Sequence, residues 1–266
     1  MSQSLTVGGS APAKGELVPL ESFSAFGDDA NEALSANLVA GQGFDIKSLT
    51  HVPFPGGSST TFEIMELTGP EPVKEIVGAL VYYGAGGVLW PTQGGTTRKG
   101  TLPVLRTDDL INAYRVGDDL GDIDPGILAQ HRSGPETYNW QSLVTAPTAP
   151  YGWGSGKDGA GKRAKEYRVL CILRPGDLFP LLVRAQPGSL NSAVQFIQRL
   201  TAAGIPYYRA VIGLSLKTET NGAGQEYPQS VFRLVGQLSK DAGLEMKHRY
   251  TDAIARSIAN VEVENS

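Results

Sequence analysis

The stretch from residue 165 to residue 239 constrains the fold of this chain more than any other. It holds closely spaced apolar segments with clear periodicity, separated by turn signals such as Pro175-Gly176-Asp177. Apolar runs of this length predict strands, and the run with 3.6-residue periodicity predicts a helix. The expected elements are strands at 165–173 and 178–184, a helix at 189–204, and strands at 206–220 and 226–239.

One further strand is expected before this stretch. Residues 73–91 are rich in β-branched and aromatic side chains and predict one long strand, bent near Gly84, Gly86 and Gly87. With it, the order becomes β-β-β-α-β-β, which is the order of the oligonucleotide-binding (OB) fold, a five-stranded Greek-key barrel with a capping helix. The predicted fold class is therefore mainly β with α. A mixed sheet with helices on one face is the alternative.

The rest of the chain is expected to decorate this barrel. Residues 1–27 predict a flexible arm, and 28–239 a single OB-fold-like domain with a helix at 28–43, a strand at 61–67 and a turn at 68–72. The turn-rich segment 91–165 predicts a long insertion with at most one helical turn, near 108–114. Residues 240–266 predict a helix and tail, with Leu244, Ile254 and Ile258 on one side.

Composition narrows the class of protein. The 33 glycines and 17 prolines among 266 residues favour strands, turns and long loops over a helix bundle. Cys171 is the only cysteine, which excludes an internal disulfide framework and predicts a small buried side chain. The N-terminal residues lack a signal-peptide pattern, and no apolar run reaches the ~20 residues of a membrane span. We therefore expect no membrane association and a cytoplasmic location, which includes the cytoplasm of a host cell.

Charge is unevenly distributed along the chain. The formal net charge is −4, yet residues 151–217 hold ten Lys and Arg against three acidic residues, whereas residues 1–150 hold eight against seventeen. A local basic field attracts an anionic polymer even when the net charge is negative. The alternative is a solvated surface that happens to be basic.

Motifs for catalysis or metal binding are weak. The segment GKDGAGKR at 156–163 matches a P-loop except that Arg163 stands where Ser or Thr would hold Mg²⁺. The three histidines show no ligand spacing, and the aspartates at 118, 119, 122 and 124 predict a solvated acidic loop. We therefore expect no enzyme activity, no catalytic residues, no metal and no cofactor.

Interleaved aromatic and basic residues give the remaining functional signal. Single-stranded nucleic acids are bound by stacking bases on aromatic faces while cations follow the backbone. Trp153 is the leading candidate because it lies among glycines and lysines, where no core is expected, and ordinary packing is the alternative for each aromatic. The predicted nucleic-acid-binding residues are Trp90, Arg98, Lys99, Trp153, Lys157, Lys162, Arg163, Lys165, Arg168, Arg174, Arg184, Tyr207, Tyr208 and Arg209.

An ordered series of short motifs adds to this signal. Residues 103–109 (PVLRTDD) are followed by Trp153-Gly154-Ser155, by 162–165 (KRAK), by 187–190 (PGSL) and by a final hairpin from Tyr207 to Leu238. Over residues 60–240 the series resembles OB-fold single-stranded DNA-binding proteins of phages and mobile elements. The cysteines of that family's insertion are absent, so its zinc ribbon is not expected here. The resemblance implies single-stranded DNA binding in replication or recombination.

The sequence thus predicts a largely sequence-independent single-stranded DNA-binding protein, of the kind that phages encode. Its partners would be single-stranded DNA and proteins of replication or recombination, and the oligomeric state stays open. A non-enzymatic viral structural or assembly protein is one alternative, because such proteins are also rich in Gly, Pro and long loops. A single-strand annealing protein is the other.

Overall fold

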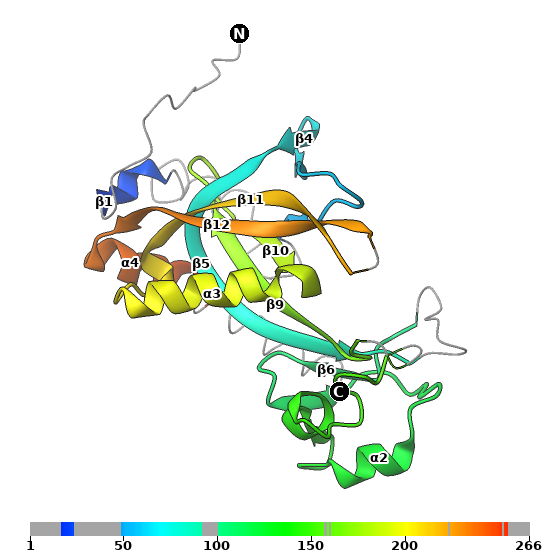
Figure 1. Cartoon of the computed structure of the whole chain (residues 1–266). Helices are drawn as coiled ribbons and strands as arrows, with labels where there is room; N and C mark the ends of the chain where they lie inside the picture. Colours follow the sequence, from blue (N-terminus) through cyan, green and yellow to red (C-terminus); the bar gives the residue numbers. More distant parts are fainter. Residues whose placement is uncertain are drawn as a thin grey trace. The chain divides into compact units, whose positions relative to one another are not determined.

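The structure is a computed structural model (Figure 1). It describes residues 17–23, 49–91, 101–156, 159, 161–222, 224–251 and 253–254. Their secondary structure is mainly β, as the sequence predicts. The predicted arginine and lysine at 98, 99 and 157, and the predicted helix at 28–43, lie outside the described residues.

Twelve strands and three α-helices are described. The strands are β1 (Leu17–Val18), β2 (His51–Val52), β3 (Phe62–Glu66), β4 (Gly69–Val73), β5 (Glu75–Leu89), β6 (Leu105–Thr107), β7 (Asn112–Arg115), β8 (Thr137–Asn139), β9 (Lys165–Leu173), β10 (Leu181–Ala185), β11 (Ala210–Thr220) and β12 (Glu226–Leu238). The α-helices are α2 (Pro125–Gln130), α3 (Leu190–Ala202) and α4 (Lys240–Met246). Short 3-10 turns are η1 (Leu20–Ser22), η6 (Pro187–Ser189) and η7 (Tyr207–Arg209), and π-helical turns are η4 (Gln141–Thr145) and η8 (Lys247–Thr251).

The expected order of elements is present. The chain runs β5, β9, β10, α3, β11 and β12, and pairing joins β5 to β9 and β11, β9 to β10, and β11 to β12. The sheet does not close into the expected barrel: within the described residues β10 pairs with β9 and β2, and β12 pairs with β11 and β1. On the edge where β10 and β12 would pair with each other in a closed barrel, β10 instead pairs with the two-residue strand β2, and β12 with the two-residue strand β1.

The chain divides into two compact units. The first holds Met1–Tyr82, Leu170–Val183 and Asn191–Ala255, and the second holds Tyr83–Val169, Arg184–Leu190 and Arg256–Ser266. We call them the first and second unit. The chain passes between them within β5, β9 and β10 and again after the first residue of α3.

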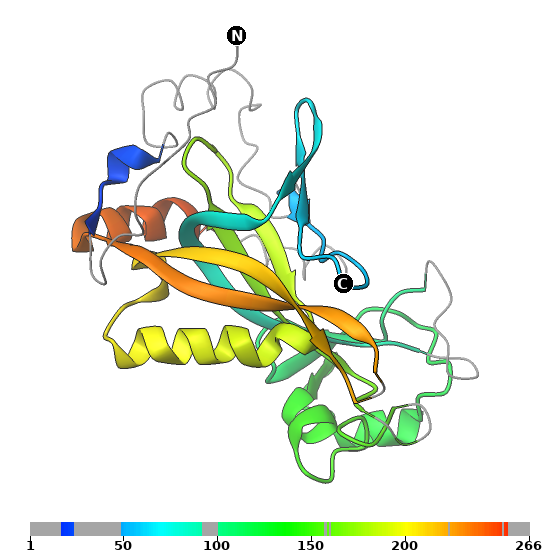
Figure 2. The same cartoon turned by 45° about the horizontal axis from the view of Figure 1, so that its top comes forward.

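In the first unit, α3 packs on the β11–β12 hairpin, and it runs alongside these strands in both views (Figures 1 and 2). Its buried side chains are Ala193, Phe196 and Leu200, spaced three and four residues apart on one face. The ring of Phe196 stacks on that of Phe232, with their centroids 5.4 Å apart. This contact fixes the helix against β12.

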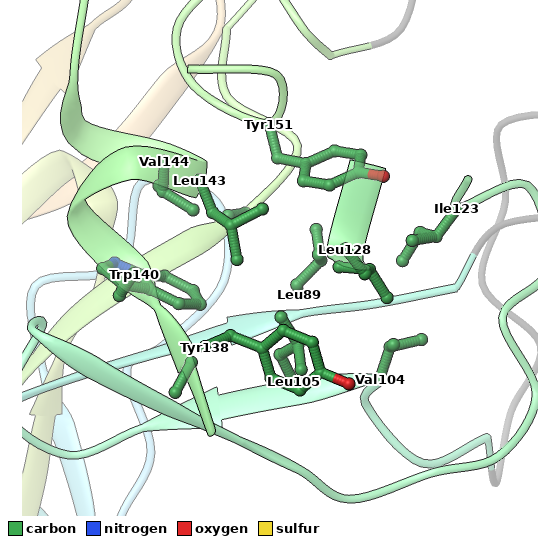
Figure 3. Close-up of a cluster of buried hydrophobic side chains, with 12 residues drawn as sticks. Leu89, Val104, Leu105, Ile123, Leu128, Tyr138, Trp140, Leu143, Val144 and Tyr151 are labelled. Atoms are coloured by element: carbon green, nitrogen blue, oxygen red, sulfur yellow. The ribbon is translucent and has the colours of Figure 1, made fainter. Parts of the chain in front are cut away.

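The second unit has its own core, which corrects the expectation of an irregular insertion at 91–165. The core packs side chains from the end of β5, from β6, β7, β8 and α2, and from the segment between Trp140 and Ala164 (Figure 3). Trp140 and Leu143 are completely buried, and Tyr151 is 5% exposed. The described part of the insertion, from residue 101 onward, therefore folds around a buried apolar cluster.

A capped turn joins β6 to β7, where the sequence predicts a helical turn. Leu110 has φ +61°, a conformation that costs a non-glycine residue about 1–2 kcal/mol. Asp109 holds the turn, because its Oδ1 accepts hydrogen bonds from the backbone N–H groups of Ile111 (2.7 Å) and Asn112 (2.8 Å). Burial opposes the charge, but these bonds and two side-chain bonds lower the pKa of the Asp109 carboxyl.

Several local expectations are also wrong. Residues 69–72, expected in a turn, belong to β4, and Tyr207–Arg209, expected at the start of a strand, form a 3-10 turn. Residues 17–22, expected in a flexible arm, form β1 and η1. In the C-terminal helix Ile254 is buried as expected, but Leu244 is 37% exposed, and Ile258 lies outside the described residues.

We predict that Gly78→Ala destabilises the protein by about 3 kcal/mol, the upper end of the usual cost of overpacking. A Cβ there would overlap the Leu173 carbonyl oxygen, and it would lie 2.7 Å from the Leu173 carbonyl carbon. Backbone atoms cannot move aside as a flexible side chain can. Urea unfolding measures the change. Gly222→Ala is the control, since a Cβ there meets nothing within 4 Å; equal stability of both variants would contradict this packing.

We predict that Asp109→Ala costs about 1 kcal/mol at pH 7, by analogy with the loss of a capping side chain. Because the folded pKa of Asp109 is lowered, its contribution is present above the ordinary aspartate range and is lost as pH falls through it. The stability difference between the wild type and the variant should therefore shrink between pH 7 and pH 3. A difference that does not change with pH would show that the charge is not involved.

Candidate functional site

Trp153 lies at the base of a loop in the second unit that backbone hydrogen bonds hold in place. It forms an antiparallel bridge with Lys162, and the N–H of Gly154 donates to the Gly161 carbonyl at 2.7 Å. Gly154 and Gly161 have φ values of +87° and +65°, which glycine adopts without strain. The Trp153 side chain is 83% exposed. A large aromatic surface is thus held open to solvent on an ordered backbone.

Ser155 ties the two sides of this loop together. Its hydroxyl donates to the Gly152 carbonyl at 2.6 Å and accepts a hydrogen bond from the N–H of Arg163 at 3.1 Å. Just before the loop, the N–H of Tyr151 donates to the Leu143 carbonyl at 2.9 Å, which anchors the segment to the core of the second unit. The position of Trp153 therefore follows from contacts at both ends of the loop.

Two of the predicted cations beside Trp153 already contact acidic groups. Lys162 Nζ lies 3.2 Å from Glu166 Oε2, and the other oxygen of Glu166 accepts a hydrogen bond from the buried indole N–H of Trp140 at 3.4 Å. Arg163 pairs with Asp122, and its guanidinium lies 5.7 Å from the centroid of the Tyr151 ring. Both side chains hold the second unit together.

Lys165 is the exposed cation at this site. It begins β9, and its Nζ donates to the Lys162 carbonyl at 3.0 Å. Among the described residues it has no ion-pair partner. Its charge is therefore exposed and not neutralised by any described carboxylate.

A second aromatic and basic group lies further along β9. Tyr167 is half-buried, its ring packs against Gly86, and the guanidinium of the exposed Arg184 lies 5.8 Å from its centroid. Burial raises the pKa of the Tyr167 phenol, and the nearby Arg106 and Arg184 lower it in part. Arg106 also pairs with Asp108 at 2.9 Å. Two guanidinium groups thus act on Tyr167: that of Arg184 lies over the ring, and that of Arg106 acts on the phenol hydroxyl.

Sequence reasoning missed Arg106 as part of this group. It lies in β6 between Leu105 and Thr107, both fully buried, so the alternation of a strand turns Arg106 to the opposite face. The alternation was present in the sequence, but a strand of three residues is too short to be recognised from its pattern. Arg168, which was predicted, is half-buried next to Tyr83, where burial raises the pKa of the Tyr83 phenol and Arg168 lowers it in part.

The other predicted residues do not join this group. Arg174 is held by Asp177 at 2.6 Å and by Glu66 at 2.7 Å, in the first unit. Tyr207 and Tyr208 pack edge to face at 5.7 Å in η7, and Arg209 Nε donates to the Leu238 carbonyl at 3.1 Å. Trp90 is half-buried after the end of β5.

The acidic loop before α2 has structural roles. Asp124 Oδ1 accepts from the N–H of Gly126 at 2.7 Å and caps α2, and Asp119 accepts from the N–H of Gly121 at 2.9 Å. Asp122 pairs with Arg163. Across the described ranges there is no cluster of three or more metal-ligating side chains. No described helix has the length and apolar character to cross a membrane.

No known family model matches this chain, and no curated protein or solved structure matches it significantly.

We predict that Trp153 accounts for most of the tryptophan fluorescence that acrylamide quenches. Trp140 is fully buried and Trp90 is half-buried, whereas Trp153 is 83% exposed. Trp153→Phe should remove the most strongly quenched component and leave the unfolding free energy within about 0.5 kcal/mol of the wild type, as for other surface changes. Trp90→Phe is the matched control and should leave that component in place. A large loss of stability in Trp153→Phe would mean that the indole is a packing element.

Proposed function

We propose that this chain is a non-enzymatic protein that binds single-stranded DNA through the second unit. The observation that carries the proposal is Trp153, an indole 83% exposed on a loop tied by hydrogen bonds. The exposed Lys165 contacts the carbonyl of Lys162, the residue that forms a backbone bridge with Trp153. An indole that the backbone holds in place binds a stacked base more strongly than a mobile one does, because less conformational entropy is lost on binding.

The strand pairing supports the same proposal. The observed pairs β5–β9, β9–β10, β5–β11 and β11–β12, with α3 between β10 and β11, match the OB order except for a pairing of β10 with β12. We propose an OB-like fold with this seam open. OB folds bind oligonucleotides with their second and third strands and with the loop between the first two. In this numbering those are β9, β10 and residues 90–164.

The candidate residues fall on these elements. Trp153 lies in the loop between β5 and β9, Lys165, Tyr167 and Arg168 lie on β9, and Arg184 lies on β10. The loop offers a stacking surface, and the strands offer the basic side chains of Lys165, Arg168 and Arg184. The exposed indole also favours single strands over duplex, since bases already stacked in a helix do not present a free face.

The strength of binding can be bounded from these contacts. Stacking on one aromatic side chain contributes about 1–3 kcal/mol per base. Three cations, Lys165, Arg168 and Arg184, each neutralising one phosphate of a single strand, give a slope of log affinity against log salt of about −2. Lys162, Arg163 and Arg174 add little to this slope because their charges contact carboxylates.

We predict that a labelled oligo(dT) binds the protein more tightly than a duplex of equal length, measured by fluorescence anisotropy at two salt concentrations. Trp153→Ala should weaken oligo(dT) binding by about 1–3 kcal/mol with the salt slope unchanged, because stacking carries no charge. Arg184→Ala should lower the slope by about 0.7. Phe179→Ala and Lys240→Ala, exposed side chains of the first unit, are the controls.

Absence of oligo(dT) binding at low salt would overturn this proposal and favour a structural or assembly role. Equal losses in Trp153→Ala and Phe179→Ala would show that the loop is not the contact surface. Oligo(rU) in the same assay tests whether the affinity depends on the sugar, that is, whether the protein distinguishes DNA from RNA.

A further inference from the structure

The β3–β4 hairpin of the first unit presents apolar side chains to solvent. Leu67, in the two-residue turn between the strands, is fully exposed, and Met65 is 63% exposed. Pro70 lies directly opposite Met65 in the ladder, so the two side chains share one face of the hairpin. We call Met65, Leu67 and Pro70 the hairpin tip. Neighbouring apolar side chains that are left exposed often mark a site of protein interaction.

The hairpin is anchored to the first unit, although its tip is exposed. Phe62 and Ile64, on the other face of β3, are fully buried, and the ring of Phe54 packs edge to face on Phe62 with the centroids 5.9 Å apart. Close to the turn, Glu66 accepts a hydrogen bond from Arg174 at 2.7 Å. The backbone under the tip is therefore ordered, and its side chains lose less conformational entropy on binding than those of a mobile loop.

The hairpin is also acidic. Residues 62–73 include three glutamates and neither Lys nor Arg. Glu66 is held by the ion pair described above, but Glu63 and Glu71 are exposed, and among the described residues neither has an ion-pair partner. Glu63 stands two residues before Met65 on β3, so both face the same side. The hairpin tip thus combines apolar side chains with negative charge, which suits an apolar surface that carries a cation.

A surface of that kind is the groove between α3 and β12, also in the first unit. Its volume is about 810 Å³, and no acidic residue lines it. Its apolar lining consists of Phe196, Leu200, Ile205, Phe232 and Leu234. Two arginines complete the lining. Arg233 pairs with Glu75 at 2.6 Å, whereas Arg199 is exposed and, within the part of the chain that the structure describes, has no ion-pair partner.

The hairpin tip and the groove belong to different sides of the first unit. The β3–β4 hairpin and α3 lie on opposite sides of the strands β11 and β12 in both views (Figures 1 and 2). The buried face of β3 and the pairing of Glu66 with Arg174 hold the hairpin in that position. A tip can therefore enter a groove only on another molecule. The contact leaves one tip and one groove unused, so further copies can add.

We propose that the hairpin tip of one molecule docks in the α3–β12 groove of a second copy of this chain. Leu67 packs on the apolar lining of the groove, and Glu63 lies near the exposed Arg199. Different surfaces of the two copies meet, so the association is head to tail. A hairpin tip offers less area than a standard interface of about 1,600 Å², so the association is weak and depends on protein concentration.

Sedimentation velocity of the DNA-free protein over a range of concentrations tests this contact. The wild type should form species larger than a dimer as its concentration rises. Leu67→Ser and Arg199→Glu should each raise the apparent dissociation constant about tenfold or more, because each removes a main contact. Both side chains are exposed, so folding should be unchanged. Leu102→Ser and Lys240→Glu, at exposed positions outside both surfaces, are the matched controls and should associate as the wild type does.

Mixing the two variants tests the head-to-tail geometry. Arg199→Glu keeps an intact tip and Leu67→Ser keeps an intact groove, so an equimolar mixture should form dimers and nothing larger. A wild type that stays monomeric or stops at a dimer, variants that associate as the wild type does, or a mixture that stays monomeric would overturn the proposal. Because no DNA is present, these outcomes are independent of the proposed DNA site.

A disulfide trap locates the contact. Thr68 is exposed beside Leu67 in the turn, and Ala203 is exposed and lines the groove. Thr68→Cys mixed with Ala203→Cys, one of them carrying a mass tag, should form a mixed disulfide under mild oxidation. Cys171 does not compete, because it is fully buried and burial raises the pKa of its thiol. Thr68→Cys mixed with Thr220→Cys is the control. No mixed disulfide in the first mixture, or equal cross-linking in both, would overturn the proposal.

Discussion

The close packing of β9 against the glycines of β5 is the constraint on which the rest of the structure depends. In the first unit, Gly78 leaves room for the carbonyl of Leu173, and in the second unit Gly86 leaves room for the ring of Tyr167. A side chain at Gly78 would overlap backbone atoms of Leu173, so β9 could not approach β5 as closely as it does there. The pairing of β5 with β9 lets one long strand serve both units and places β9 where its polar residues reach the surface.

A second constraint limits the positive charge at the surface: some of the basic side chains form ion pairs that hold the units together. The basic balance of residues 151–217 overstates the charge that a phosphate backbone meets, because Lys162, Arg163 and Arg174 contact Glu166, Asp122 and Glu66. Asp122 and Glu66 lie outside that stretch of sequence, so counting charges within it could not reveal the pairing. What remains exposed is Lys165 on β9 and Arg184 on β10, together with the indole of Trp153.

The elements with long, regular patterns could be predicted from sequence, and those with short patterns could not. Strands β5, β11 and β12 have eleven residues or more, and α3 has apolar residues at helical spacing, so each leaves a clear period. The second unit instead uses strands of three or four residues, such as β6 and β8. Its core collects apolar residues that stand far apart in the chain, among them Val104, Ile123 and Leu143. The turns that bring them together depend on aspartate caps, which give no hydrophobic period. Trp153 was identified because its glycine-rich surroundings exclude a core, whereas Arg106 needed the burial of its neighbours on β6.

The central claim is that the exposed indole of Trp153 stacks on the bases of a single strand, and its own fluorescence reports this most directly. Emission should be recorded in the wild type and in Trp153→Phe while oligo(dT), or a hairpin duplex of equal length, is added at low salt. The account predicts quenching by oligo(dT) in the wild type, much weaker quenching by the hairpin, and loss of the oligo(dT) effect in Trp153→Phe. Equal quenching in both proteins, or no quenching of the wild type while oligo(dT) binds, would contradict it.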